Sequence, residues 1–164
     1  MSQDLMRRVA VGAAAGVAGT LVLQGTVMGM QRLAPQWDAP EAEDPASFML
    51  WQGEKHLPRK VWMGIPAKAE TAAGVGLSLA YGATFGALYA AARGHSRSRL
   101  LEGALLGTAV WAVGYLGWLP AAKLIPPVWR QELKQITGPV VQHLVYGVVT
   151  VAAYEYLRGK WSGN

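Results

Sequence analysis

Residues 9–30 read VAVGAAAGVAGTLVLQGTVMGM and contain no Asp, Glu, Lys or Arg. Three further stretches, 72–92, 103–122 and 136–154, are equally free of charged residues. About 20 residues of helix, at 1.5 Å each, cross the roughly 30 Å hydrocarbon layer, where a helix satisfies its own backbone hydrogen bonds. The stretches also lack the polar stripes of a soluble helix bundle. We therefore predict an all-α, polytopic membrane protein with four transmembrane helices, at about 9–31, 69–92, 102–120 and 138–157.

The composition agrees with a membrane protein. The chain has 164 residues, of which 52% are hydrophobic and 15% charged, and it contains 20 glycines. This composition is a poor match to a soluble globular domain, so we expect a single membrane domain over residues 1–164. The net charge of +5 is more typical of membrane orientation and anionic-lipid contact than of nucleic-acid binding. A sequence without cysteine has no disulfide, thiolate metal site or thiol nucleophile.

One segment of the sequence is repeated. YGATFGALYAAARG at 81–94 aligns without a gap with YGVVTVAAYEYLRG at 146–159, sharing six of fourteen residues. RVAVGAAAG at 8–16 aligns in the same way with RLLEGALLG at 99–107. We predict two helical hairpins that are parallel repeats, related by a pseudo-twofold axis along the membrane normal. Chance similarity among Ala-, Gly- and Val-rich helices is the alternative explanation.

The basic residues near the helix ends predict the orientation. On one side of the membrane, seven Lys and Arg residues fall in three short segments that contain three acidic residues. On the other side, eight Lys and Arg residues are spread over two longer connections that contain seven acidic residues. By the positive-inside rule, we place both termini in the cytoplasm. The acidic residues at helix ends, Glu70, Glu102 and Glu155, are expected to be reached by water. Lipid headgroups are expected to bind Arg93, Arg97 and Arg99.

The connection between the first two helices has a helix start of its own. Asp44-Pro45 combines an N-cap with proline at the first helical position. The residues that follow mix tryptophan and other apolar side chains with lysine and arginine, as in helices that lie among lipid headgroups. We predict an amphipathic interfacial segment at about 45–63. The acidic stretch at 38–45 is interpreted as a solvated linker, because it lacks the glycine turn and ligand spacing of a calcium loop.

Small residues spaced four apart allow helices to approach closely in lipid. Four GxxxG motifs predict a compact four-helix bundle, and a glycine face left over would favour self-association. The glycines expected at helix contacts are Gly12, Gly16, Gly25, Gly29, Gly82, Gly86, Gly103 and Gly107.

Polar side chains at membrane depth are candidate sites, because each needs a partner there. His143 is the leading candidate, through proton handling or through axial ligation of a haem or chlorin. The alternative, which we favour, is an interhelical hydrogen bond from a neutral histidine. The expected polar intramembrane network consists of Gln24, Tyr81, Tyr115, Gln142, His143 and Tyr146. We expect no metal site and no bound cofactor unless His143 ligates one.

No pattern of residues indicates catalysis. The three histidines are spread over two loops and one predicted helix, and the sequence contains neither a GxSxG elbow nor a P-loop. We therefore expect no catalytic residues and a protein that is not an enzyme.

The second half of the chain carries a family resemblance. The stretch from Trp111 to Trp129, with Leu119-Pro120 and Pro126-Pro127, and the His143-x-x-Tyr146-Gly147 helix resemble the YagU-like family of bacterial inner-membrane proteins. The resemblance implies a multi-helix protein of the bacterial inner membrane and brings no established reaction. A His-Glu pair in the third helix of that family corresponds here to Tyr115-Leu116.

These observations lead to one functional prediction and two alternatives. We predict a non-enzymatic integral membrane protein that is a structural or accessory subunit of a larger complex. Its expected partners are membrane lipids and other membrane-protein subunits or a second copy of itself, and not nucleic acid. The first alternative is a small transporter or channel with a polar site near His143, and the second is a haem- or pigment-binding protein.

Overall fold

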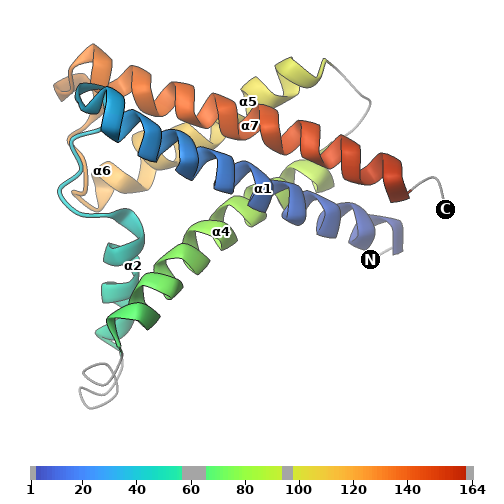
Figure 1. Cartoon of the computed structure of the whole chain (residues 1–164), viewed down its shortest axis with the longest axis horizontal. Helices are drawn as coiled ribbons and strands as arrows, with labels where there is room; N and C mark the ends of the chain where they lie inside the picture. The colour runs from blue at the N-terminus through green and yellow to red at the C-terminus, as the bar shows by residue number, and fades with distance from the viewer. Residues whose placement is uncertain (1–2, 57–65, 94–97, 162–164) are drawn as a thin grey trace.

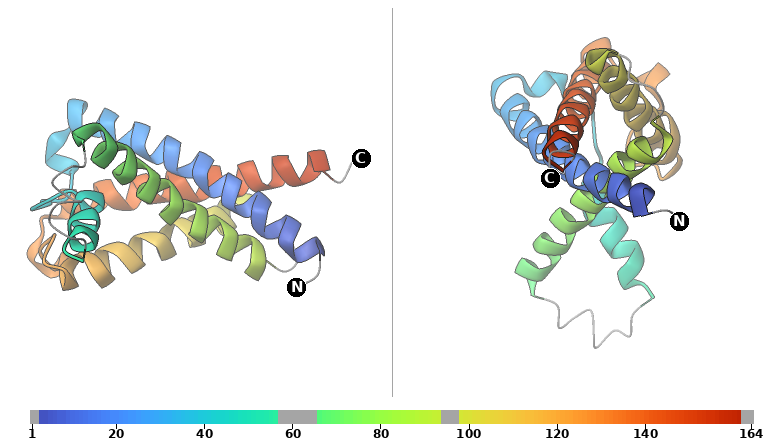
Figure 2. Two further views of the ribbon diagram at one scale, coloured as in Figure 1. Left: turned by 90° about the horizontal axis from the view of Figure 1, so that it is seen from below. Right: turned by 90° about the vertical axis from the view of Figure 1, so that its right-hand side faces the viewer.

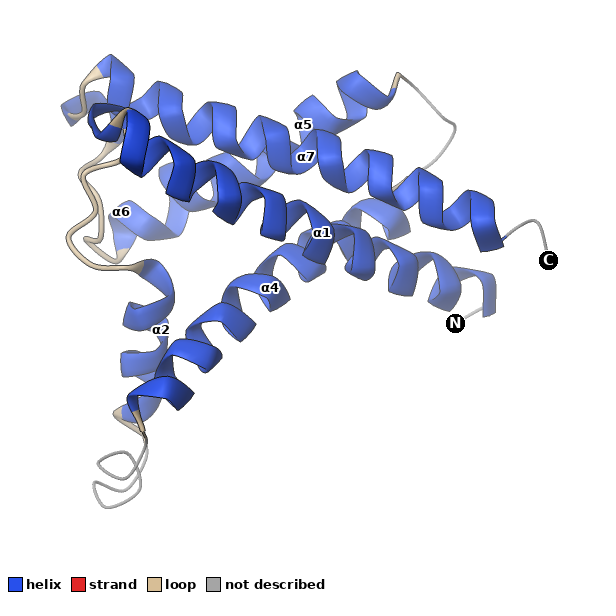
Figure 3. Cartoon of the chain, in the orientation of Figure 1, coloured by secondary structure: helices blue, strands red, loops and turns tan. Residues whose placement is uncertain are grey.

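A computed structural model of the chain describes residues 3–56, 66–93 and 98–161, and all regular structure within them is helical (Figures 1 and 3). The first half contains α1 (Gln3–Leu33), the 3₁₀ turn η1 (Pro35–Trp37), α2 (Pro45–Glu54) and α4 (Ala67–Ala92). The second half contains α5 (Arg99–Trp111), the π-helical segment η2 (Ala112–Trp118), α6 (Leu119–Ala121), the 3₁₀ turn η3 (Val128–Arg130) and α7 (Leu133–Trp161).

Four helices are long and apolar enough to cross a membrane: α1, α4, the run from α5 through α6, and α7. This confirms the predicted helix class and number of spans, and it indicates a multi-pass membrane protein. The helices extend beyond the charge-free stretches, because polar residues continue them into the expected headgroup region. The clearest case is α7, which begins at Leu133 and includes Pro139 within its length.

The two ends of the molecule differ in composition. The N-terminus, the C-terminus, the end of α4 and the start of α5 lie at one end, which we call the basic end because Arg8, Arg93 and Arg99 are there (Figure 1). The opposite end, called the α2 end, holds η1, α2 and α6. The helix α2 begins at Pro45, and the Asp44 carboxylate accepts a hydrogen bond of 2.8 Å from the Ser47 amide, as the Asp44-Pro45 pair predicts.

Glycines lie where α1 crosses α4. A Cβ atom placed on Gly16 would overlap the carbonyl oxygen of Gly82, and one on Gly12 would overlap that of Gly86. A Cβ on Gly86 would also lie 2.8 Å from the Cα of Gly16. Backbones this close leave no room for a side chain, so larger residues would force the two helices apart.

The same kind of contact joins α5 to α7. A Cβ on Gly103 would lie 2.6 Å from the Cα of Val148, and one on Gly107 would overlap the carbonyl oxygen of His143. A Cβ on Gly147 would lie 2.5 Å from the backbone nitrogen of Gly107. Residues of α5 and α7 therefore meet at backbone contact distance over about one helical turn.

Gly25 and Gly29 differ from the other expected glycines. A Cβ at either position would meet no atom within 4 Å in the described part of the chain. They do not mediate a helix contact within one molecule, contrary to expectation, because α1 has diverged from α4 by the time the chain reaches them (Figure 1).

The four apolar helices fit a membrane helical bundle, as predicted, but they are packed unevenly. The helix α1 packs against both α4 and α7, and α5 packs against α7, whereas α4 and α5 meet over only a short region. The first half of α4 leans away from α5 and α7 together with α2 (Figure 2). A close glycine contact at one point allows two helices to cross at an angle, and their ends then separate.

Candidate functional site: a polar cavity at the α2 end

The divergence of α4 leaves a cavity of about 620 Å³ among α1, α4, α5 to α6, and α7, called here the inner cavity. Connection residues and the start of α2 line it as well. The six residues of the expected polar network all line this cavity: Gln24, Tyr81, Tyr115, Gln142, His143 and Tyr146. Residues on four different helices thus meet at one place.

Backbone carbonyls hold two polar groups of the cavity, the Tyr146 hydroxyl and the His143 imidazole. Tyr146 donates a hydrogen bond of 2.8 Å to the carbonyl oxygen of Gly82, which links α7 to α4. His143 Nδ1 lies 2.8 Å from the carbonyl oxygen of Pro139. A carbonyl oxygen only accepts, so Nδ1 carries the proton and Nε2 of the neutral ring is left as an acceptor. The ring of Tyr115 meets that of His143 edge-on, with 5.7 Å between centroids.

Acidic side chains from the connection after α1 fold back over the cavity. The Tyr115 hydroxyl lies 3.5 Å from Glu41 Oε1, and Gln142 Nε2 lies 3.4 Å from Asp38 Oδ1. Gln142 is only 4% exposed. Partial burial, and then the neighbouring carboxylates of Asp44 and Asp38, raise the pKa of Glu41 above its usual 4.5. The stretch that we interpreted as a solvated linker therefore contributes two carboxylates, Glu41 and Asp44, to the cavity wall.

A second cavity of about 450 Å³, called the outer cavity, lies between α2 and the first half of α4. Four residues, Gln24, Asp44, Ala46 and Ser78, line both cavities, which therefore adjoin. The outer cavity reaches the exposed residues Glu70 and Thr71 at the start of α4. Together the two cavities lead from the surface at the α2 end to His143.

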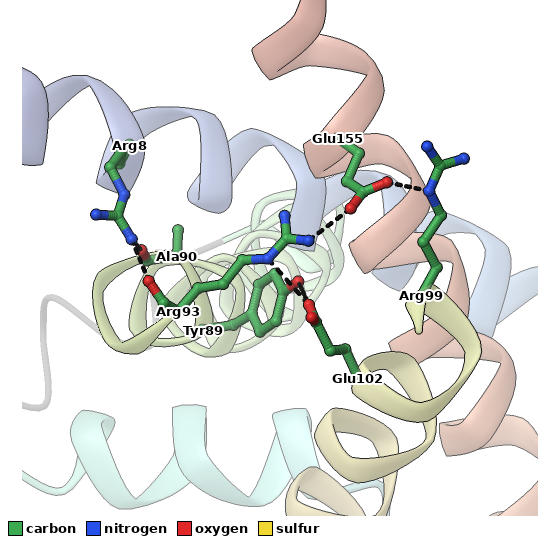
Figure 4. A network of polar contacts seen from close by, with 7 residues as sticks. All are labelled: Arg8, Tyr89, Ala90, Arg93, Arg99, Glu102 and Glu155. Atoms are coloured by element: carbon green, nitrogen blue, oxygen red, sulfur yellow. Dashed lines mark hydrogen bonds and ion pairs between the residues drawn. The ribbon is translucent and has the colours of Figure 1, made fainter. Parts of the chain in front are cut away.

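The basic end is closed by a cluster of charged residues and one tyrosine, called the basic-end cluster. Its members are Arg8, Tyr89, Arg93, Arg99, Glu102 and Glu155 (Figure 4). Arg93 Nε lies 2.9 Å from Glu102 Oε2, and its terminal nitrogen lies 2.5 Å from Glu155 Oε1. Arg99 pairs with the other oxygen of Glu155. Arg8 donates hydrogen bonds to the carbonyl oxygens of Ala90 and Arg93, at 2.9 and 2.6 Å. The cluster ties the ends of all four spans together.

This cluster corrects two expectations. The side chain of Arg93 is only 5% exposed, so it binds carboxylates within the protein and is not available to lipid headgroups. Glu102 and Glu155 are 10% and 17% exposed, less than we expected for helix ends in water. The Arg99 side chain, at 73%, is exposed, and Arg97 lies outside the described residues. The cluster has a signal in the sequence: one arginine and two glutamates, Arg93, Glu102 and Glu155, lie near the ends of three predicted helices.

The inner cavity combines several kinds of polar group with apolar walls. Among residues 3–56, 66–93 and 98–161, no three His, Asp or Glu side chains are grouped in a way that would hold a metal ion. The site instead offers hydroxyl, amide and imidazole groups, aromatic faces and carboxylates around a hollow. Such a lining, mainly apolar with a few convergent polar groups, is typical of small-molecule sites.

The fold indicates a multi-pass helical membrane protein, and its inner cavity is lined by polar groups from four helices. The sequence was compared with protein-family models, curated proteins and solved structures, and none of these searches finds a match. The resemblance to the YagU-like family therefore gains no support from them.

Proposed function

We propose that this protein is a small, non-enzymatic membrane transporter that binds a solute in the inner cavity beside His143. The observation that carries the proposal is that the polar residues of four spans line one cavity that continues to the surface at the α2 end. The basic end, in contrast, is held shut by backbone contacts between helices and by the basic-end cluster. A site that is open to one side and sealed from the other corresponds to one state of an alternating-access cycle.

The proposal includes an orientation and a location. With the basic end in the cytoplasm, the cavity opens to the other side of the membrane, and we place the protein in a bacterial inner membrane. The density of Lys and Arg near the basic end supports this orientation.

We also retain the two-copy architecture as a proposal. Two pairs of aligned residues make similar contacts: Gly12 and Gly16 meet α4, and the aligned Gly103 and Gly107 meet α7. Arg8 bonds to the carbonyl oxygen of Ala90, and the aligned Arg99 pairs with Glu155, the residue that aligns with Ala90. The contact between α1 and α7 has no counterpart of similar extent between α5 and α4, so the two copies are arranged asymmetrically.

Single cysteines test the transport proposal cleanly, because the natural chain has none. Ser78 lines both cavities, so Ser78→Cys should react with a neutral, membrane-impermeant thiol reagent. In a transporter, the reagent should reach this cysteine from the α2 side and, as the protein cycles, from the basic side too. Leu88→Cys is the control, since Leu88 is on the same helix, 57% exposed and directed to lipid, where a thiol is not ionised and does not react.

The labelling experiment has three possible outcomes. Reaction of Ser78→Cys from both faces supports a transporter. Reaction from the α2 side alone would overturn transport in favour of a one-sided binding protein. Failure to react from either side would mean that the cavity is closed to water and would overturn the proposal altogether.

A second candidate is the accessory-subunit function that the sequence first indicated. It is favoured by the open space beside Gly25 and Gly29, which leaves a glycine face on the second half of α1 for another helix. Replacing both glycines with leucine should then release a partner or a second copy from protein purified in mild detergent. A natural protein that migrates solely as a monomer would contradict this function.

A further inference from the structure

The charge of the cavity walls differs from the charge of the whole chain. The sequence contains 15 Lys and Arg against 10 Asp and Glu. Among the residues that the structure describes, however, the charged side chains lining the two cavities are all carboxylates: Glu41, Asp44, Glu54 and Glu70. Lys55, which follows α2, and Lys68 on α4 do not line a cavity; the Lys55 ammonium lies 3.2 Å from the ring centroid of Trp51. The route inward therefore attracts cations and repels anions.

The inner cavity adds aromatic faces to these carboxylates. Tyr81, Tyr115, Trp118 and Tyr146 line it, and the face of an aromatic ring attracts a cation. Apolar side chains such as Leu77 and Val110 form much of the remaining wall. A small inorganic cation would leave these apolar walls unfilled, because it needs a full set of oxygen ligands. An organic cation with an apolar body would use the aromatic rings, the apolar walls and the carboxylates together.

We infer that the solute is an organic cation with an apolar body, whose charge lies near Glu41 and whose body fills the inner cavity between Tyr81, Tyr115 and Trp118. This inference deepens the proposed transport function and rests on it. The volume of about 620 Å³ falls within the range of roughly 300–1,000 Å³ of small-molecule sites. Glu41 is the principal carboxylate, because it already lies beside Tyr115 at the inner wall.

Tetraphenylphosphonium, a cation with four phenyl groups, is a suitable probe. It should slow the modification of Ser78→Cys by the neutral thiol reagent, since probe and cysteine share the cavity. Tetraphenylborate has nearly the same shape and the opposite charge, and it should give little protection. Protection of one residue is a local measurement, so partitioning of either ion into detergent or lipid does not imitate it.

Paired variants test the role of Glu41. In the Ser78→Cys background, Glu41→Gln should raise the concentration for half-maximal protection about tenfold, which corresponds to loss of one favourable charge contact. Glu43→Gln is the matched control: it removes a carboxylate from the same connection at a position that lines neither cavity, and protection should be unchanged. Glu41→Asp, which keeps the charge, should retain most of the protection and shows that the effect is not one of folding.

The result that would overturn this inference is equal or better protection by tetraphenylborate, or protection that Glu41→Gln leaves unchanged. No protection by the cation would overturn it too. These failures are distinguishable from failure of the proposed function. If Ser78→Cys reacts from both faces but is not protected by the cation, the protein is a transporter for another class of solute. If Ser78→Cys reacts from neither face, both proposals are wrong.

Discussion

Glycine has a different role at different positions of the same GxxxG pattern. A Cβ at Gly82 would overlap Thr20 Oγ1 and lie 3.1 Å from the carbonyl oxygen of Gly16, whereas one at Gly25 would meet nothing within 4 Å. Gly82–Gly86 and Gly25–Gly29 have the same four-residue spacing, so the sequence predicts a helix contact equally at both pairs. Which pair is at a helix contact depends on where α1 and α4 diverge, and this is a property of tertiary packing.

Gly82→Leu should lower the free energy of unfolding by about 1–3 kcal/mol, the usual cost of overpacking, or more if the helices separate. The expected measurement is a fall in Tm of the protein in detergent. Gly25→Leu, made as a control, should leave Tm of the monomer unchanged. Equal effects of the two substitutions would contradict the crossing point that we describe.

Glu41 is a residue whose ionisation should oppose folding. Burial, and next the carboxylates of Asp44 and Asp38, raise its pKa above 4.5, while the hydrogen bond from Tyr115 acts in the opposite direction. A carboxyl with a raised folded-state pKa contributes stability below about pH 4.5, and this contribution is lost as the pH rises through the folded-state pKa. Under the proposed function, in which Glu41 supplies a charge for binding, such a destabilising group would be kept.

Glu41→Gln should therefore raise Tm at pH 7, because the glutamine cannot ionise. The gain should shrink as the pH falls toward 4.5, where Glu41 in the natural protein becomes protonated. Melting both proteins in detergent between pH 4 and pH 8 measures the difference. A gain that grows on acidification would mean that the carboxylate is stabilising and that its pKa is lowered.

Sequence reasoning identified six polar residues that line the inner cavity but not its carboxylates. Polar residues within apolar stretches stand out, because lipid gives them no partner, and this led to Tyr115, Gln142 and His143. Glu41 is in a connection rich in acidic residues and proline, where nothing in the local pattern distinguishes a side chain that folds back from one in water. Its contact with Tyr115 spans 74 positions of the sequence.

At the scale of the helices, the basic-end cluster is the principal polar link between the two hairpins. Arg93 follows α4, Glu102 is on α5 and Glu155 is on α7, and the rings of Tyr89 and Tyr154 meet edge-on beside them at 5.6 Å. Tyr89 donates a hydrogen bond of 2.5 Å to Glu102. In an alternating-access cycle, opening the basic end requires these ion pairs to separate, so the cluster is the gate of the proposed transporter.

Arg93→Ala should destabilise the protein by about 3 kcal/mol, because it removes the arginine that pairs with two largely buried carboxylates. The control is Glu132→Gln, which removes an exposed ion pair in which 3.9 Å separate Glu132 from Lys134. This substitution should change stability by about 1 kcal/mol or less. Thermal unfolding in detergent measures both. Similar small effects for the two variants would show that the cluster is solvated and does not hold the helices together.

The π-helical segment η2 is an element that the periodicity did not predict. The buried residues of this span are Gly103, Gly107, Val110, Gly114, Tyr115 and Leu119. The step from Gly114 to Leu119 is five residues, which suits a π-helical turn and not the three or four of an α-helix. Pro120 gives a local reason, because its missing N–H and its ring disturb an α-helical turn. The wider turn keeps both Gly114 and Leu119 on the buried side.

At the scale of the whole molecule, the sequence predicted the class and number of the spans and not their arrangement. Length and the absence of charge are enough to recognise a membrane-crossing helix, because the bilayer imposes both. The separation of α4 from α5, and with it the cavity, comes from long-range packing between residues whose individual patterns look alike. The predicted helical bundle is therefore present, but the sequence did not predict that α4 diverges from α5 within it.

The most direct test of this account asks whether its two ends lie on opposite sides of a membrane. Two single-cysteine variants serve, Gln52→Cys on α2 and Lys160→Cys near the end of α7, since both positions are exposed. An impermeant maleimide, applied to vesicles of known orientation, should modify Gln52→Cys from the outer face and Lys160→Cys only from the cytoplasmic face. Modification of both cysteines from the same face would contradict the four-span arrangement on which the cavity and its proposed function depend.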